Sequence, residues 1–300
     1  MGASGSAEAP AGRAAVGAGG SAALGGKGGA AQGAAGTAAV GGRGGAESSG
    51  GAAAGNGGAG AQGGAGSERA LFWDSFDSDS ALDSARYETL SPNCSGTGRI
   101  GLDASFGHTG SHALRVDGGA GYCNHVFVRP KLAAALPSPL YVRVFVQVAL
   151  PLGAGHTTFG ALHDMSEDKD LRIGGQNQVL IWNRESDDAT LPELSPAGVA
   201  LSTAFQAGSW HCLEWMVDGS KPEMRTWLDG AAVDGLTLDA EPTADVDRQW
   251  SAKTDWHPRL LDLRFGWESY GEQAETLWFD DVAIGPARFG CATAPSPRSP

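Results

Sequence analysis

Five polar side chains along the 300-residue chain are of the types that acid–base chemistry requires. The set holds two histidines, an arginine, a glutamine and a tyrosine: His125, His163, Arg172, Gln176 and Tyr270. An arginine or an amide can neutralise a carboxylate, a histidine can remove a proton, and a tyrosine can return a proton to a leaving oxygen. Elimination from a uronate sugar needs all three, because neutralising its C6 carboxylate makes the C5 proton more acidic. Each residue alone is weak evidence, since a histidine on a strand more often makes a structural hydrogen bond.

Most other catalytic signatures are absent from the sequence. It has no P-loop, no GxSxG elbow, no HExxH zinc motif and no EF-hand loop. No predicted strand carries the carboxylate pattern that a sandwich-type glycosidase would use. The formal net charge of −13 argues against nucleic acid as a partner, because phosphate binding requires a basic surface.

Aspartates near the two ends of the folded region indicate a cation site. Asp77 follows the first predicted strand, and Asp280 lies in the last one. First and last strands are neighbours in a jelly roll, so these carboxylates can converge. Carbonyls of Thr109 and His112, in the loop 108–112, can complete an oxygen-only set of the kind that Ca²⁺ prefers. The sequence therefore predicts a structural calcium ion, the alternative being aspartates that cap turns without a metal.

The segment Tyr141–Ala149 is the clearest strand in the sequence. Its even positions are all valine, so a period of two turns the valines toward the core. The odd positions then form the opposite face: Tyr141, Arg143, Phe145 and Gln147. This composition is typical of a surface that contacts sugars, and an ordinary polar exterior is the alternative.

A second strand, Gln178–Arg184, is predicted to contribute to the same kind of surface. We expect Val179 and Ile181 to point inward. The opposite face would then present candidate sugar contacts at Gln178, Trp182 and Arg184. A core position is the alternative for Trp182, since tryptophan is more often buried than exposed.

The remaining pattern is that of a sandwich. Short apolar runs separated by Gly, Pro, Asn and Asp predict further strands, and no segment of helical length competes. Regular short strands favour an all-β, concanavalin-like β-jelly roll whose curved sheet forms a groove for an extended polysaccharide. The further expected strands are 70–76, 112–117, 124–129, 157–164, 170–174, 210–218, 224–228, 260–268 and 276–285.

Composition divides the chain into three parts. Residues 1–67 hold 25 of the 47 glycines and no aromatic residue. Such a stretch buries too little apolar surface to order itself, which predicts a disordered tether. Residues 68–293 are long enough for one folded domain, and the Pro- and Ser-rich residues 294–300 are predicted to be a disordered tail. We expect a monomer.

Four cysteines lie in the predicted folded domain, without a CxxC pair. This usage favours two disulfides in an oxidising compartment, and hence an extracellular protein. Three pairings are possible, of which we favour Cys94–Cys123 with Cys212–Cys291; buried free thiols are the alternative. No signal peptide is visible in residues 1–20, and no apolar stretch is long enough to span a membrane.

Five segments of the chain resemble the glucuronan-lyase-like family, which includes proteins of the cellulose-induced secreted type. The resemblance covers roughly residues 68–293. It is carried by FWDSFDS at 72–78, HTGSHALRVDGGAGYCNHVFV at 108–128, LRIGGQNQVLIW at 171–182, WHCLEWMVDG at 210–219 and LWFDDVAIGPARFGC at 277–291.

This resemblance implies a polysaccharide lyase-like protein that acts on β-linked polyuronate, with a β-jelly roll, two disulfides and a bound calcium. It implies that Arg172 and Gln176 neutralise the substrate carboxylate, that His125 or His163 is the base, and that Tyr270 is the acid. The alternatives from the sequence are a non-catalytic carbohydrate-binding module on a flexible stalk and, less favoured, a surface-anchored adhesion protein.

Overall fold

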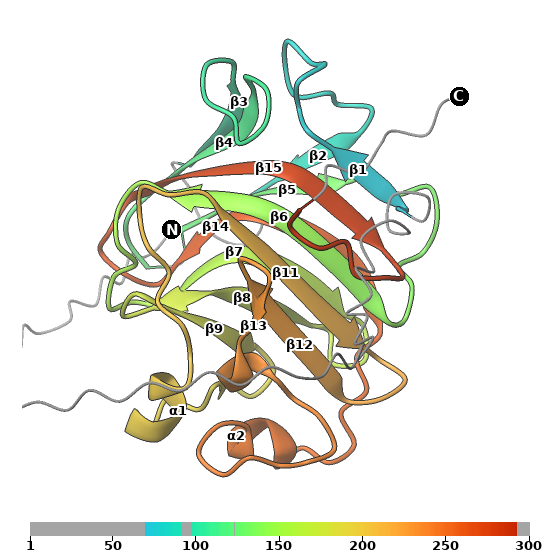
Figure 1. Cartoon of the computed structure of the whole chain (residues 1–300), viewed down its shortest axis with the longest axis vertical. Helices are drawn as coiled ribbons and strands as arrows, with labels where there is room; N and C mark the ends of the chain where they lie inside the picture. The colour runs from blue at the N-terminus through green and yellow to red at the C-terminus, as the bar shows by residue number, and fades with distance from the viewer. Residues whose placement is uncertain (1–69, 92–97, 123, 293–300) are drawn as a thin grey trace, which may run out of the picture. The chain divides into compact units, whose positions relative to one another are not determined.

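Two antiparallel β-sheets packed face to face form the folded part of the protein (Figure 1). The computed structural model describes residues 70–91, 98–122 and 124–292. This architecture confirms the all-β sandwich. The predicted tether at 1–67 and the predicted tail at 294–300 lie outside the described residues. No helix in the described ranges is long and apolar enough to cross a membrane.

The first sheet contains eight of the described strands. β1 (Phe72–Asp74) pairs with β15, so the first and last strands are neighbours, as predicted. The other strands lie in the order β13 (Ala231–Ala232), β12 (Glu223–Leu228), β11 (His211–Asp218), β6 (Leu140–Val148), β15 (Glu275–Gly285), β4 (Ala113–Gly118) and β3 (Arg99–Asp103).

The second sheet contains seven of the described strands. Their order is β10 (Ala189–Leu191), β9 (Val179–Arg184), β8 (Lys169–Gln176), β7 (Thr157–Asp164), β14 (Leu260–Ser269), β5 (Asn124–Pro130) and β2 (Tyr87–Leu90). Because the central strands β7 and β14 are far apart in the chain, residues from distant segments meet on this sheet.

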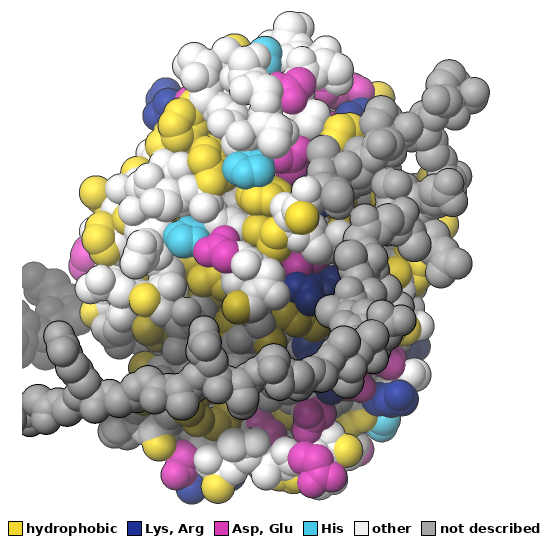
Figure 2. Space-filling model, in the orientation of Figure 1, with side chains coloured by type: hydrophobic (Ala, Val, Ile, Leu, Met, Phe, Trp, Pro, Cys, Tyr) yellow, Lys and Arg dark blue, Asp and Glu magenta, His cyan; other side chains and the backbone are white. Residues whose placement is uncertain are grey.

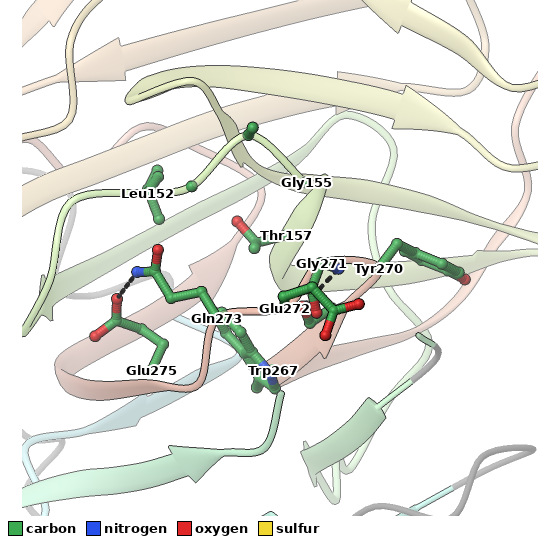
Figure 3. A pocket seen from close by; sticks show the side chains of 12 residues that line it. Leu152, Gly155, Thr157, Trp267, Tyr270, Gly271, Glu272, Gln273 and Glu275 are labelled. Carbon is green, nitrogen blue, oxygen red and sulfur yellow. Dashed lines mark hydrogen bonds between the residues drawn. The ribbon is translucent and has the colours of Figure 1, made fainter. Parts of the chain in front are cut away.

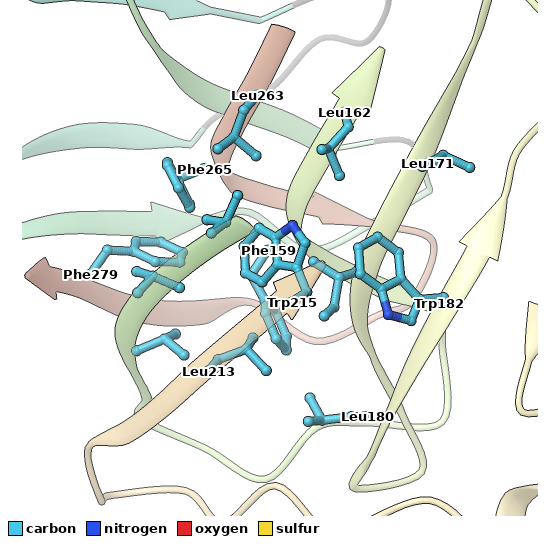
Figure 4. Packing of buried hydrophobic residues seen from close by; sticks show 14 of the residues in the cluster. Phe159, Leu162, Leu171, Leu180, Trp182, Leu213, Trp215, Leu263, Phe265 and Phe279 are labelled. Atoms are coloured by element: carbon cyan, nitrogen blue, oxygen red, sulfur yellow. The ribbon is translucent and has the colours of Figure 1, made fainter. Parts of the chain in front are cut away.

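The core between the sheets is built from alternating strand positions (Figure 4). All four valines of β6 are buried in it, which confirms the predicted inward face. Trp182 of β9 and Trp215 of β11 meet there edge to face, with ring centroids 6.1 Å apart. The indole Nε1 of Trp182 donates a hydrogen bond to Thr226 Oγ1 on the facing sheet, at 2.9 Å.

Short elements and turns connect the strands. Helices α1 (Pro196–Ala200) and α2 (Arg248–Ser251) and a 3-10 turn at Asp234–Leu236 lie in connections. The hairpin between β12 and β13 turns at Asp229 and Gly230, both with positive φ, as an Asp-Gly turn requires.

A disulfide joins Cys212 of β11 to Cys291 after β15, as predicted, with 5.8 Å between the Cα atoms. The predicted Cys94–Cys123 pair lies outside the described residues. Arg288 and the backbone N–H of Gly290 bind the buried carboxylate of Glu214, so the end of the domain is fixed to the eight-stranded sheet.

Candidate functional site

The outer face of the seven-stranded sheet carries a cluster of charged and aromatic side chains. Strand pairing aligns one row across five strands: His125, Glu268, Thr158, Gly174 and Ile181. The neighbouring row consists of Arg264, Ala161, Arg172 and Asn183. Register shifts between β7, β8 and β14 interrupt the ladder at this point, and such bulges re-aim side chains beside functional sites.

Glu268 lies at the centre of this cluster. Its Oε2 is 3.4 Å from His125 Nε2, and its Oε1 is 3.2 Å from Arg172 Nε. The Arg172 N–H does not point at that oxygen, so the contact is an ion pair rather than a hydrogen bond. A second carboxylate, Glu185 of the turn after β9, lies 3.0 Å from the other end of the guanidinium. Arg172 is therefore already neutralised by two carboxylates.

Burial sets the protonation of Glu268, His125 and Tyr270 around Arg172. It raises the pKa of Glu268 to about 7, although Arg172 acts in the opposite direction. Burial, followed by the charge of Arg172, lowers the pKa of His125 to about 4. Burial and the charge of Glu268 raise the pKa of Tyr270 above its ordinary value. At neutral pH the cluster thus offers an uncharged imidazole and a protonated phenol.

Tyr270 is surrounded by rings and by one guanidinium. Arg172 Cζ lies 5.7 Å from the centre of its ring. Ring centroids of Tyr122, His125 and His156 lie 5.1, 6.2 and 6.3 Å away. Tyr122 is 80% exposed and stands at the solvent side of the group, which makes it a sugar-contact candidate that the sequence did not single out.

A cavity of about 720 Å³ opens next to Tyr270 (Figure 3). It is lined mainly by the loop 152–155, by Trp267 and by the segment 269–273. Arg172, His125 and Glu268 do not line it, so the cavity adjoins the acid–base cluster and shares only Tyr270 with it. At its wall Gly155 approaches Gly271 closely: a Cβ on Gly155 would lie 2.7 Å from the Gly271 Cα.

The structure brings three of the five predicted acid–base residues together, namely His125, Arg172 and Tyr270. Gln176 lies on the same outward side of β8, four residues beyond Arg172, and its amide donates to the Ala154 carbonyl at 2.8 Å. His163 belongs to a separate ion-pair group, since its Nδ1 lies 3.1 Å from Asp170 Oδ1.

Glu268 is the central residue that sequence reasoning missed. The signal was present, because Glu268 is two positions before Tyr270 and a period of two puts both on one face. Its partners His125 and Arg172 come from strands that are distant in sequence, and only the strand order places them beside it.

The predicted sugar contacts on β6 lie on the wrong sheet for this cluster. Arg143 is completely buried, and it donates to the Asp281 and Gly290 carbonyls. The ring of Phe145 stacks on that of His108, with ring centroids 3.6 Å apart. Gln147 is buried and pairs with Trp278 on the neighbouring strand β15. These positions contradict a surface role for the three residues. Tyr141 is partly exposed, but also on the eight-stranded sheet.

Three aromatic residues add to the outer face of the eight-stranded sheet. Figure 2 shows this face, with hydrophobic side chains gathered beside histidines. Phe106 stacks on Trp210 and lies tilted against Trp278, with ring centroids 5.7 and 4.8 Å away. Arg115 lies over the ring of Trp278.

The predicted face assignment of β9 is wrong by one residue. Leu180, Trp182 and Arg184 point to the buried side, and Val179 and Ile181 face outward. Arg184 packs against Trp250 and forms an ion pair with Asp187. Gln178 is exposed in the tight turn before β9, with φ of 66°. An uninterrupted apolar run does not show which alternate residues face the core, and this explains the error.

The predicted calcium ligands gather around the loop 108–112. Asp280 Oδ2 accepts hydrogen bonds from the N–H groups of His108 and Thr109, and Asp77 Oδ1 accepts from those of Ser111 and His112. The Thr109 and His112 carbonyl oxygens converge as well, since a Cβ on Gly107 would lie 3.1 and 2.8 Å from them. Both carboxylates therefore lie against this loop, and two of its carbonyl oxygens lie near each other; carboxylate and carbonyl oxygens are the ligand types that Ca²⁺ prefers.

The comparisons with known proteins identify the family of this chain. A family model described as the Cip1-like core domain of polysaccharide lyase-like proteins matches residues 76–287. The chain therefore belongs to the Cip1-like, polysaccharide lyase-like family.

Among solved structures, one of "Cellulose induced protein, Cip1" is 36% identical, with a TM-score of 0.68; the match covers 74% of this chain and all of that one. An endo-β-1,4-glucuronan lyase from the fungus Trichoderma reesei is 13% identical, with a TM-score of 0.45, over 73% of this chain and 96% of that one. No curated protein matches the chain.

Proposed function

We propose that this domain is a secreted polysaccharide lyase that cleaves a β-linked polyuronate of the glucuronan type by β-elimination. The observation that carries the proposal is the patch formed by Arg172, the uncharged His125 and the protonated Tyr270 on one sheet face. Family membership supports a polysaccharide as the substrate class. The Cys212–Cys291 disulfide is in keeping with secretion.

In the proposed reaction, Arg172 binds the C6 carboxylate of a uronate residue, and Gln176 assists from the same strand. His125 takes the C5 proton, the C5–H electron pair forms the C4=C5 double bond, and the C4–O4 bond breaks. Tyr270 donates its proton to the leaving O4 oxygen. Burial, and after it the charge of Arg172, lowers the basicity of His125 in the free protein and keeps its imidazole uncharged and ready to accept the proton.

Ultraviolet absorbance of the unsaturated uronate product tests the proposal, with glucuronan, alginate and other polyuronates as substrates. Tyr270→Phe removes the proton donor but keeps the ring, so it should lower the rate about 100-fold or more with little change in melting temperature. Tyr141→Phe, on the other sheet, is the matched control and should keep the wild-type rate. An unchanged rate in Tyr270→Phe excludes Tyr270 as the acid. No product from any polyuronate contradicts the lyase.

A non-catalytic carbohydrate-binding module is the second candidate. The exposed Tyr122 beside Tyr270 favours it, because an exposed ring next to polar groups suits sugar stacking. Retention on a polyuronate column without any product, together with weaker retention of Tyr122→Ala, would support the module instead of the lyase.

A structural calcium ion completes the proposal. Asp77 and Asp280 would hold it through carboxylate oxygens, and Thr109 and His112 through their carbonyls. The ion would fix the first and last strands and the loop 108–112 to one another, at a distance from the acid–base cluster. Its contribution would be to stability rather than to chemistry.

A further inference from the structure

Arg172 has no ionic capacity to spare for a substrate carboxylate. Its guanidinium contacts Glu185 at 3.0 Å and Glu268 at 3.2 Å. A bound uronate would place a third carboxylate on the same cation. Like charges in a partly buried site repel strongly, so one of the protein carboxylates must give up its charge or leave.

The two protein carboxylates differ in what they can do. The Glu185 side chain is 29% exposed, so it can turn into water and remain charged. The Glu268 side chain is 2% exposed and is held under the patch, so it can lose its charge only by taking up a proton.

We propose that the site recognises anionic sugars by exchange of counter-ions: when a uronate carboxylate binds Arg172, Glu268 takes up one proton from solvent and becomes neutral. Arg172 keeps two anionic partners throughout, Glu185 and either Glu268 or the sugar. Binding of a uronate is then linked to pH, whereas binding of a neutral sugar is not. This inference rests on the proposed role of Arg172 in carboxylate recognition.

The surroundings of Glu268 permit this exchange. His125 on β5, Thr158 on β7, Arg172 on β8 and Tyr270 after β14 face it, and Asp170 and Glu185 act on it from farther away. Burial and the acidic neighbours oppose its charge, and Arg172 is the main group that favours it. Neutralising Arg172 with a ligand therefore removes the chief stabiliser of the Glu268 anion. Because the pKa of Glu268 in the free protein is about 7, its protonation near neutral pH requires little free energy.

Isothermal titration calorimetry in buffers of different ionisation enthalpy measures the proton directly. Methyl β-glucuronoside is a suitable probe, because it has no substituent on O4 and cannot be cleaved. We expect uptake of about 0.9 proton at about pH 8 and about 0.1 at about pH 6, with affinity falling about tenfold per pH unit above pH 7. Methyl β-glucoside, as the neutral control, should show neither effect.

Two variants separate the carboxylates. Glu268→Gln should bind the glucuronoside at pH 8 about tenfold more tightly than wild type and without proton uptake. Glu185→Gln should retain the uptake. Infrared difference spectra of the wild type should show a protonated carboxyl band appearing on binding, which gives a readout independent of any variant.

The outcomes distinguish this inference from the proposed function. Binding of the glucuronoside with buffer-independent heats, or with uptake that persists in Glu268→Gln, overturns the counter-ion exchange and leaves Arg172 recognition intact. Absence of binding at every pH overturns recognition of the carboxylate by Arg172, and the exchange with it.

Discussion

The Oε2 atom of Glu268 lies 3.4 Å from the Nε2 atom of His125, although both side chains are almost completely buried. Burial acts on the two groups in opposite directions, raising the pKa of the acid to about 7 and lowering that of the imidazole to about 4. The pair therefore favours two uncharged groups around pH 5 to 6 in the folded protein.

The two shifted pKa values should make the free energy of unfolding depend on pH. A raised pKa of Glu268 gives stability that is present at low pH and lost as pH rises from about 4.5 through 7. The lowered pKa of His125 gives stability that is present above about 6.5 and lost as pH falls toward 4. Between these limits the two contributions oppose each other in the wild type.

In Glu268→Gln, of the two groups only His125 still contributes to the pH dependence of stability. The free energy of unfolding of this variant, relative to wild type, should rise with pH by up to about 1.4 kcal/mol per unit between about pH 4.5 and 7. Urea unfolding at several pH values measures it. Glu185→Gln is the control and should follow the wild-type curve. A Glu268→Gln curve parallel to wild type would show that Glu268 has an ordinary pKa.

Removing Arg172 should destabilise the fold mainly because it leaves the buried carboxylate of Glu268 without a cation. Arg172→Met strands the Glu268 carboxylate without its cation. Because the carboxyl group can then take up a proton, this should cost about 1.4 kcal/mol at pH 8, one unit above its pKa of about 7, and less at pH 6, where Glu268 is already protonated. Adding Glu268→Gln should restore most of the loss at pH 8. A double-mutant cycle by chemical unfolding measures this coupling, and simple additivity of the two changes would contradict it.

Removing calcium should lower the melting temperature of the proposed holoprotein. EDTA takes away the cation that neutralises Asp77 and Asp280, so their approach to the loop 108–112 becomes less favourable. Asp77→Asn should be less stable than wild type and insensitive to EDTA. Metal analysis of the dialysed wild type covers the case of a very tight ion. Equal melting with and without EDTA, together with no bound metal, would exclude the calcium site.

Breaking the disulfide should reduce stability substantially. Cys212 and Cys291 close a loop with a sequence separation of 79, for which chain-entropy arguments give about 4.5 kcal/mol. Cys212→Ser with Cys291→Ser should lower the melting temperature without altering sugar binding, because the bond lies on the eight-stranded sheet. A loss of binding at a temperature where the variant is folded would connect this bond to the site.

The sequence was most informative where polar and apolar residues alternate. The alternating valines of β6 predicted its inward face correctly, and each strand that was predicted from residue 112 onward lies close to its predicted position. The short edge strands β2, β3, β10 and β13 were missed, because a few residues carry little periodic signal. The phase of β9 was wrong for the related reason that its apolar run is continuous.

The candidate site was only partly predictable. Residue types identified His125, Arg172 and Tyr270, but the sequence gives no information on which sheet a strand joins. The polar positions of β6 were therefore grouped with residues that lie on the other sheet. Glu268 was not identified from the sequence, because an isolated glutamate on a strand resembles an ordinary exposed charge until its neighbours are known.

The contact between Gly155 and Gly271 bears on how this domain would respond to random mutation. The backbone next to Tyr270 rests against a neighbouring loop at a point where Gly155 has no room for even a methyl group. A substitution at Gly155 would push the tyrosine segment outward while leaving the sandwich core intact. In a deep mutational scan, Gly155 should then rank with the acid–base residues in a turnover screen and with tolerant surface positions in an expression screen.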